Sequence, residues 1–492
     1  PGQVFVLYSE QRARLKDCSV GKYDQQNNAS GRVTLNYSKP IKLRSLNVLR
    51  AIIALTSALL LTVPISSAAA TKNLPATKAE KVGMSSERMK RMTALGDRYI
   101  QNKQVAGMVN LVMRNGKVVH YEAHGSKGAS DSRPMQKDDL FRIYSMTKPI
   151  TAAAAMQLYE QGKFQLSDPV SKFVPELKDV KVLNANGQLE DQDAQMTMHQ
   201  LLTHTTGLSY GFAAQVDLVD QAYMGADIWA AKDLDEFAQR VAKLPLKFQP
   251  GSRYHYSIAV DITGLVVQRL SGQSFDVYLR ENIFEPLGME DTFFAVPQNK
   301  ISRFLPNHIL NPQTGGLMDI SQVPADNPLA AFFRNRKNVA MVDYETVGLF
   351  SGGGGLVSTA MDYARFAEAM RAGGILGGKR ILSPKTVSYM AQNHLKPSMQ
   401  MGGIGEQPTT DGNTSGVGFG LGFGVITNPA YTGVIGSAGE FNWGGAAGTV
   451  FWIDPVEEIV VISMIQLMSS PWPLRSELQV ATYQAITDSY EN

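Results

Sequence analysis

Two hairpin patterns, one near each end of the chain, constrain the fold more than any other feature of the sequence. Residues 108–125 are two runs of strand-forming side chains around Asn115-Gly116, the strongest two-residue signal for a hairpin turn. Residues 448–464 are two apolar runs that reverse at Pro455, and such strands are typically buried on both faces. We therefore predict that both ends of the chain contribute strands to one antiparallel sheet.

The segments between and beside these hairpins are predicted to be helices and loops. Apolar residues recur at helical spacing in four segments, and a closing helix is expected near the end of the chain. Pro-, Gly- and Asn-rich composition predicts two long loops. The predicted helices are 145–162, 196–204, 234–244, 258–270 and 476–489, and the predicted loops are 305–345 and 397–418.

These elements together predict an α/β (α+β) fold class. The antiparallel sheet, flanked by helices, is expected from residues of about 80–140 and 430–490. A mostly helical and loop subdomain is expected from about 160–350. The whole of 71–492 is thus predicted to be one large domain.

The charge balance argues against a nucleic-acid partner. Lys and Arg total 47 and Asp and Glu total 44, but residues 1–70 hold nine of the former and three of the latter. The remainder therefore carries a small net negative charge, without the basic stripe that nucleic acids require. The one cysteine, Cys18, also lies in the leading part, so residues 71–492 contain neither a disulfide nor a cysteine metal ligand.

The leading part has the order of a secretory signal peptide. Basic residues between 39 and 50 precede the apolar run 51–63, and small residues follow at 67–70. We therefore predict a signal peptide at 41–70, upstream read-through or an appended segment at 1–40, and a periplasmic or secreted bacterial enzyme. A permanent membrane anchor is the less favoured alternative, because the apolar run is shorter than the ~20 residues of a membrane span.

The tetrapeptide Ser145-Met146-Thr147-Lys148 places a hydroxyl and an amine three residues apart, on one face of a helix. A serine hydroxyl becomes a strong nucleophile when a neighbouring base removes its proton, and a desolvated lysine can be neutral enough to do so. The pattern alone is weak, because Ser19 to Lys22 matches it by chance. We predict that Ser145 is a nucleophile and that Lys148 is its base, against the alternative that Ser145 merely begins a helix.

Tyr256-Ser257 lies just ahead of another predicted helix. A phenol in this place can reach Ser145 and Lys148 and serve first as base and then as acid. The alternative is a core tyrosine with one satisfied hydroxyl. Asp261 is expected to hold local structure rather than to join the chemistry.

The segment Trp443-Gly444-Gly445-Ala446-Ala447-Gly448 leads into the strand expected from Thr449. Glycines let a backbone pass close to a substrate, and an amide at a strand edge can complete an oxyanion hole with the amide of the nucleophile. The alternative is a tight turn with no part in the chemistry.

In this order and with these flanks, the three elements resemble the serine β-lactamase and penicillin-binding-protein superfamily. Within it the chain is most similar to class C β-lactamases and, more specifically, to family VIII carboxylesterases, over roughly residues 80–485. Supporting stretches that look like the family are 166–170, 201–208, 283–292 and 352–359, which we interpret as scaffold.

The resemblance implies a serine β-lactamase-like fold and a set of site residues. Ser145 would be the acylated nucleophile, Lys148 and Tyr256 would share the base and acid roles, and the amides of Ser145 and Ala446 would form the oxyanion hole. Trp443, Gly444 and Gly445 would contact the substrate.

Two departures favour the esterase branch of the superfamily. β-Lactamases usually have Lys-Thr-Gly where this chain has Trp443-Gly444-Gly445, and that lysine binds a substrate carboxylate. Its loss removes a contact worth roughly 1.5–3 kcal/mol. Ile258 also replaces an asparagine of the class C enzymes. We therefore expect a serine carboxylesterase that hydrolyses small, short-chain esters.

Three alternatives remain open. A β-lactamase or a D-amino or DD-peptidase would use the same residues. A catalytically silent penicillin-recognising protein would bind cell-wall peptides without turnover. The segment Gly207-Leu208-Ser209-Tyr210-Gly211 also matches the nucleophile elbow of α/β-hydrolases, with His255, His308 and His394 as conceivable partners, although it follows a predicted helix and not a strand.

We expect no metal and no cofactor. His120 and His124 are four residues apart in a predicted strand, and His199 and His204 are five apart, so neither pair has a metal spacing. An apolar pocket lined by Trp443, Tyr210, Phe212, Phe332 and Phe333 is conceivable. The expected partner is a small-molecule ester, with no stable membrane insertion after signal cleavage, and the sequence leaves the oligomeric state open.

Overall fold

The computed structural model describes residues 74–323, 347–399, 401 and 416–490, which belong to one compact unit, Ala69–Asn492. The predicted signal peptide and the segment before it lie outside the described residues and stay predictions. Within the described residues, no helix combines the length and apolar character needed to cross a membrane.

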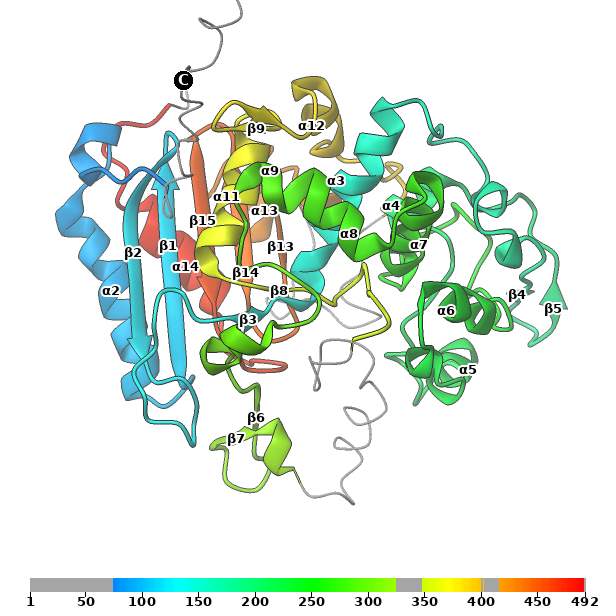
Figure 1. The fold of residues 1–492 in the computed structure, drawn as a ribbon, viewed down its shortest axis with the longest axis horizontal. Helices are drawn as coiled ribbons and strands as arrows, with labels where there is room; N and C mark the ends of the chain where they lie inside the picture. Colours follow the sequence, from blue (N-terminus) through cyan, green and yellow to red (C-terminus); the bar gives the residue numbers. More distant parts are fainter. Residues whose placement is uncertain (1–73, 324–346, 400, 402–415, 491–492) are drawn as a thin grey trace, which may run out of the picture. The chain divides into compact units, whose positions relative to one another are not determined.

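One antiparallel sheet organises the fold and joins both ends of the unit (Figure 1). In the described part of the chain it has seven strands, in the spatial order β11-β12-β13-β14-β15-β1-β2. The predicted fold class is therefore confirmed. The strands are β11 (Val417–Phe419), β12 (Gly424–Ile426), β13 (Phe441–Gly444), β14 (Val450–Asp454), β15 (Ile459–Met464), β1 (Gly107–Arg114) and β2 (Lys117–Gly125).

Both predicted hairpins form. Asn115 and Gly116 have φ of 51° and 69°, the left-handed pair that a tight hairpin turn requires, and they join β1 to β2. In the second hairpin, Oδ1 of Asp454 accepts hydrogen bonds from the amides of Val456 and Glu457 and so holds the turn after Pro455. The two hairpins meet where β1 pairs with β15, from Val109 opposite Met464 to Arg114 opposite Ile459.

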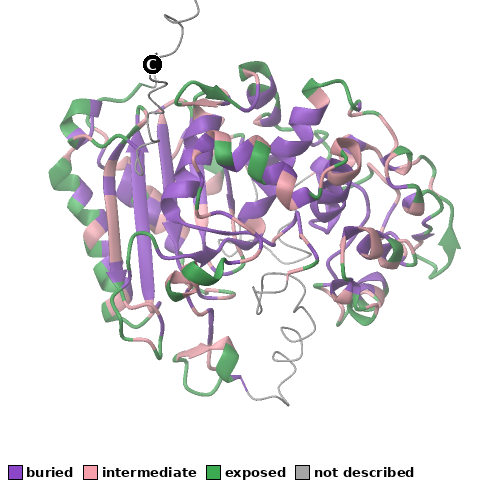
Figure 2. Cartoon of the chain, viewed as in Figure 1, coloured by how far each residue is buried: buried purple, intermediate pink, exposed green. Residues whose placement is uncertain are grey.

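Alternation along the central strands creates two cores. In β1, Val109, Leu111 and Met113 face the larger core, whereas Met108 and Val112 face the smaller one. Helices α2 (Ser86–Gln101) and α14 (Leu474–Tyr483) cover the smaller core, and α11 (Ala360–Arg371) covers the other face of the sheet (Figure 1). Figure 2 shows the central strands buried and α2 exposed on its outer side.

The mostly helical part packs around α3 (Thr147–Glu160), in which every residue from Thr147 to Leu158 is buried. A helix apolar on all sides suits this central place. The other three helices that the sequence predicted in this part form within about three residues of their expected ends. They and their neighbours are α4 (Met198–Leu202), α5 (Leu218–Gly225), α6 (Leu234–Val241), α7 (Ala259–Ser271), α8 (Phe275–Leu279) and α9 (Glu285–Leu287).

Short elements were the ones that the sequence analysis missed. The sheet begins at Val417 and not near 430, because three-residue strands are too short to show an alternating pattern. Part of the predicted loop 305–345 forms the hairpin of β6 (His308–Leu310) and β7 (Leu317–Asp319). The other short elements are β3 (Phe141–Arg142), β8 (Val357–Ser358), β4 (Val182–Leu183), β5 (Leu189–Glu190), β9 (Ile375–Leu376), β10 (Lys379–Arg380), α12 (Pro384–Met390) and α13 (Pro429–Thr432).

The closing helix is also shorter than predicted. It ends at Tyr483 instead of continuing to 489, because Ile486 pairs with Met84 and the amide of Thr487 bonds to the carbonyl of Gly83. Tertiary pairing therefore overrides the helical pattern at this end.

Two buried carboxylates meet beside this helix. The hydroxyl of Tyr483 lies 3.0 Å from Oε2 of Glu440 and 2.7 Å from Oδ2 of Asp454. Burial raises the pKa of the Glu440 carboxyl from 4.5 to about 7, and the charge of Asp454 adds to the rise. The folded state therefore holds an extra proton between about pH 4.5 and 7, and stability falls as pH rises through this range.

We predict that Glu440→Gln removes this loss. The amide keeps an oxygen for Asn442 and gains an N–H for the Tyr483 hydroxyl, without a buried charge. The free energy of unfolding of the wild type should fall by roughly 3 kcal/mol between pH 5 and pH 8, and that of the variant should change much less. Urea unfolding at several pH values measures this, with the exposed Glu290→Gln as control; equal slopes in wild type and Glu440→Gln would contradict it.

Candidate active site

Ser145 lies in a 3-10 turn, Tyr144–Met146, that leads directly into α3. Tyr144 has a φ of 43°, a strained value for a residue with a side chain. Surrounding bonds hold it, because Asn307 donates to the Tyr144 hydroxyl at 2.7 Å and the amide of Ile143 donates to Leu356 at 3.1 Å. The backbone that presents Ser145 is therefore fixed from several elements.

The structure brings Ser145, Lys148 and Tyr256 together. The Tyr256 hydroxyl donates to Oγ of Ser145 at 2.7 Å, and Nζ of Lys148 lies 3.2 Å from the same oxygen. The lysine nitrogen also lies 4.5 Å from the centre of the Tyr256 ring. Both potential proton carriers thus touch one hydroxyl, as the sequence predicted.

The electrostatics distinguish the two carriers. Burial lowers the pKa of the Lys148 amine to about 7, although the charge of Asp261 opposes this. Burial raises the pKa of the Tyr256 phenol, against weaker opposing contributions from hydrogen bonds with Ser145 and Trp443. At neutral pH a large fraction of Lys148 is therefore neutral, while Tyr256 keeps its proton.

Gly353 is a site residue that the sequence analysis treated only as scaffold. Its carbonyl accepts a 2.6 Å hydrogen bond from Nζ of Lys148, and its amide donates to Oδ1 of Asp261 at 2.9 Å. A Cβ at this position would lie 2.2 Å from Oδ2 of Asp261, so a side chain does not fit. The glycine run 352–355 was the available signal, but the sequence does not show which glycine meets the lysine.

The Trp443–Gly448 segment connects two strands rather than only preceding one. Trp443 and Gly444 end β13, and β14 begins at Val450, one residue later than expected. The Trp443 ring lies 5.5 Å from that of Tyr256. A Cβ on Gly445 would lie 2.4 Å from the carbonyl oxygen of Ile143, so this turn lies against the residues just before Ser145.

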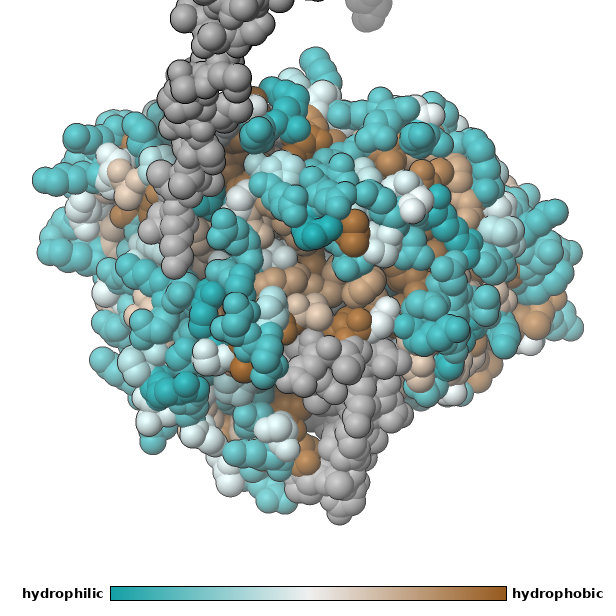
Figure 3. Space-filling view, in the orientation of Figure 1, coloured by the Kyte–Doolittle hydropathy of each residue, from teal (hydrophilic) through white to brown (hydrophobic). Residues whose placement is uncertain are grey.

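Aromatic rings extend from this centre toward the surface. Tyr210 lies 5.4 Å from Tyr256 and stacks on Phe212 at 5.0 Å, and Phe212 is 42% exposed. Figure 3 shows apolar side chains on the floor of a hollow near the middle of the viewed face. Phe332 and Phe333, which were also considered for an apolar pocket, lie outside the described residues.

Ser209 has a different environment from Ser145. Its hydroxyl is buried and donates to Asp220, while Nε2 of His255 lies 3.3 Å away. In a hydrolytic triad the carboxylate would orient the histidine, but here it binds the serine itself. Asp220 is held by Lys247 at 3.2 Å, so this cluster has the pattern of a structural network.

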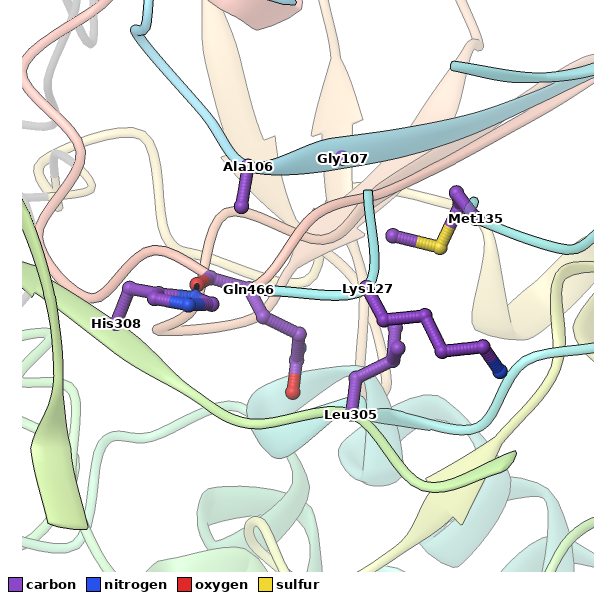
Figure 4. Close-up of a pocket in the computed structure, with 7 residues that line it drawn as sticks. All are labelled: Ala106, Gly107, Lys127, Met135, Leu305, His308 and Gln466. Carbon is purple, nitrogen blue, oxygen red and sulfur yellow. Dashed lines mark hydrogen bonds between the residues drawn. The ribbon is translucent and has the colours of Figure 1, made fainter. Parts of the chain in front are cut away.

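The two remaining histidines proposed as partners lie elsewhere. Nδ1 of His394 lies 3.2 Å from Nε2 of His199, and Nδ1 of His308 bonds to the carbonyl of Gln466 at 2.9 Å. His308 and Gln466 line a small pocket with Ala106 and Lys127 (Figure 4). Ser145 is not among the residues that line it, and His308 also accepts from the amide of Ala129.

No group of three or more His, Cys, Asp or Glu side chains in the described residues is arranged to hold a metal ion. Nε2 of His120 and Nε2 of His124 lie 3.8 Å and 3.6 Å from the same oxygen of Glu122. Nδ1 of His124 is 2.9 Å from Asp97. Strand β2 and helix α2 thus enclose a small polar cluster on the sheet face away from α11.

Known proteins resemble this chain over most of its length. A family model described as Beta-lactamase matches residues 89–484. Protein Rv1367c of Mycobacterium tuberculosis is 33% identical, and Esterase EstB of Burkholderia gladioli is 31% identical; each match covers 74% of this chain and 86% of the relative. The structure of simvastatin synthase (LovD) from Aspergillus terreus has a TM-score of 0.68 at 24% identity, covering 81% of this chain and 98% of that one. The expected fold and family are thus confirmed, and the chain belongs to the Beta-lactamase family of serine hydrolases.

Proposed function

We propose that the chain is a carboxylesterase that hydrolyses small, short-chain, uncharged esters through an acyl-enzyme on Ser145. One observation carries the proposal: a phenol and a desolvated amine both lie within hydrogen-bond distance of the Ser145 hydroxyl. The name of the relative EstB, an esterase, supports ester substrates.

In the proposed reaction, neutral Lys148 accepts the proton of Ser145 as the hydroxyl attacks the ester carbonyl. Tyr256, protonated at this stage, donates its proton to the departing alcohol, and the Lys148 ammonium then returns the proton it took from Ser145 to the Tyr256 oxygen. Water then enters on the same side and the residues reverse their roles, which releases the acid.

The proposed oxyanion hole uses the amides of Ser145 and Ala446. Neither amide donates to another backbone group among the described residues, so both can bind a substrate oxygen. The close approach of Gly445 to Ile143 supports this arrangement, because it holds the two backbone segments together. Such donors stabilise the charge that develops on the carbonyl oxygen.

Substrate choice is proposed to follow from Trp443. An indole beside Tyr256 offers an apolar surface and no positive charge, and Tyr210 and Phe212 continue that surface. A substrate that must present a carboxylate there, as a β-lactam does, would lose a charge-assisted contact. Neutral esters are therefore favoured over β-lactams and D-amino peptides.

A matched pair of variants tests the nucleophile. Ser145→Ala should reduce hydrolysis of p-nitrophenyl butyrate by roughly 10³-fold or more and should abolish fluorophosphonate labelling. Ser209→Ala should keep both within several-fold and should lower the free energy of unfolding by about 1–3 kcal/mol, because it removes buried hydrogen bonds. The wild type should hydrolyse a chromogenic cephalosporin poorly.

Three of the alternatives have their own outcomes in this experiment. Ester turnover that survives in Ser145→Ala but not in Ser209→Ala would move the nucleophile to Ser209. Strong cephalosporin turnover would favour a β-lactamase. Failure of a fluorophosphonate to label folded wild type would favour a non-catalytic penicillin-recognising protein.

The pH profile tests the base. Because Lys148 must be neutral to accept a proton and its pKa is about 7, kcat/KM should rise with pH through about 7. Rates are measured from pH 5 to 9 at a wavelength where p-nitrophenol and its anion absorb equally. Lys148→Arg, which stays protonated, should lose roughly 10²–10⁴-fold and show no such rise; a wild-type profile that is flat across this range would contradict the assignment.

A further inference from the structure

Asp261, near the start of α7, is a buried carboxylate to which only donors are directed among its described contacts. Oδ1 accepts from the hydroxyl of Ser351 and from the amide of Gly353, and Oδ2 accepts from the hydroxyl of Tyr210 at 3.2 Å. Burial raises the pKa of the Asp261 carboxyl above its ordinary 3.8, while the charge of Lys148 and the hydrogen bonds from Ser351, Gly353 and Tyr210 oppose this rise. The Gly353 amide and the Lys148 charge both favour the ionised form of this buried carboxyl.

Gly353 links the Asp261 carboxylate to Lys148 through hydrogen bonds. Gly353 donates its amide to Asp261 and accepts the Lys148 ammonium or amine on its carbonyl at 2.6 Å. A second bond keeps the loop on α3, because Thr151 donates to the carbonyl of Gly352 at 2.8 Å. The carboxylate thus fixes the carbonyl that aims Nζ of Lys148 at Ser145.

The separation between the Asp261 carboxylate and the Lys148 amine affects how far the carboxylate raises the pKa of the amine. No direct ion pair joins Asp261 to Lys148 among the described contacts, since the backbone of Gly353 lies between them. A direct ion pair would keep Lys148 protonated, so that it could not act as a base. Without the charge of Asp261, burial would leave the Lys148 amine neutral. With the peptide of Gly353 between them, Asp261 raises the pKa of the Lys148 amine by less than a direct ion pair would.

Three other ring side chains, Tyr256, Tyr210 and His204, lie around Lys148. Tyr256 lies ahead of α7, and Tyr210 lies under the amine at 5.2 Å from ring centre to Nζ. His204 packs on Tyr256 at 4.7 Å between ring centres, and burial, assisted by the charge of Lys148, lowers the pKa of its imidazole far below 6.5. Asp261 is the carboxylate whose charge acts on the Lys148 amine, and it opposes the effect of burial on the pKa of that amine.

We propose that Asp261 is a positioning residue that acts through Gly353: it holds the Lys148 amine against Ser145, and its charge sets the pH at which that amine becomes a base. This inference rests on the proposed role of Lys148. It extends the structural role that the sequence predicted for Asp261.

The test compares the full-length wild type with Asp261→Asn, which keeps the shape and removes the charge. The readout is the rate constant for fluorophosphonate labelling of Ser145 from pH 5 to 9, so it does not depend on the ester chosen. Removal of a negative charge makes Lys148 lose its proton more easily, so the rise in rate should shift to lower pH by about 0.5–1.5 pH units. The plateau rate should fall several-fold because the Gly353 carbonyl is held less firmly.

Three control variants separate charge from structure. Tyr210→Phe removes one donor to the carboxylate and Ser351→Ala removes another, but both keep the charge, so each should lower the plateau without shifting the rise. Asp261→Glu keeps the charge and should leave the pH of the rise at the wild-type value. An Asp261→Asn profile that rises at the wild-type pH would overturn the inference.

The failure of the inference can be distinguished from that of the proposed function. If folded wild type is not labelled at Ser145 at any pH, the proposed function itself fails and the inference falls with it. If wild type is labelled but Asp261→Asn does not fold, as circular dichroism would show, the two variants that remove a donor to Asp261 decide. In that case unchanged plateau rates in both Ser351→Ala and Tyr210→Phe would overturn the positioning role, and lowered rates would support it.

Discussion

The site depends on the burial of one amine, that of Lys148. Nζ of Lys148 is fully enclosed and has two described partners, the Ser145 hydroxyl and the Gly353 carbonyl. Desolvation disfavours its charged form, and this is what lets an ordinarily cationic side chain accept a proton near pH 7. The rest of the structure serves to exclude water from this nitrogen and to keep its two partners in place. A solvent-exposed lysine with the same neighbours would remain protonated.

The fold achieves this exclusion by joining distant segments around α3. The helix is buried from Thr147 to Leu158, and Lys148 in its first turn is enclosed with it. The sheet brings Trp443, near the end of β13, against Tyr256 beside Ser145, and Asp261 lies in the first turn of α7, which follows Tyr256. The loop at 351–353 closes the remaining side through Gly353. Sheet and helical part therefore both contribute to the surroundings of one hydroxyl.

The sequence predicted the long, strongly patterned elements well and the short ones poorly. The Asn115-Gly116 hairpin and the doubly buried second hairpin carry their own local signals, and both formed. Three-residue strands such as β11 have no detectable period, and the end of α14 depends on pairing with Met84. For the site, residue type and order selected Ser145, Lys148 and Tyr256, which the structure brings together, while their catalytic roles stay predictions. Gly353 was missed because its role is a backbone carbonyl, which any residue has, and only the folded chain shows which carbonyl meets the lysine.

The central claim is that the acyl group of an ester passes through Ser145, and trapping that intermediate tests it most directly. With p-nitrophenyl butyrate the leaving group departs easily, so acylation should outpace hydrolysis of the acyl-enzyme. Acid quenching within the first turnovers, followed by intact-mass measurement and peptide mapping, should show one butyryl group on the peptide that contains Ser145. A butyryl group on any other side chain, or a burst of p-nitrophenol without a butyrylated protein, would contradict the account.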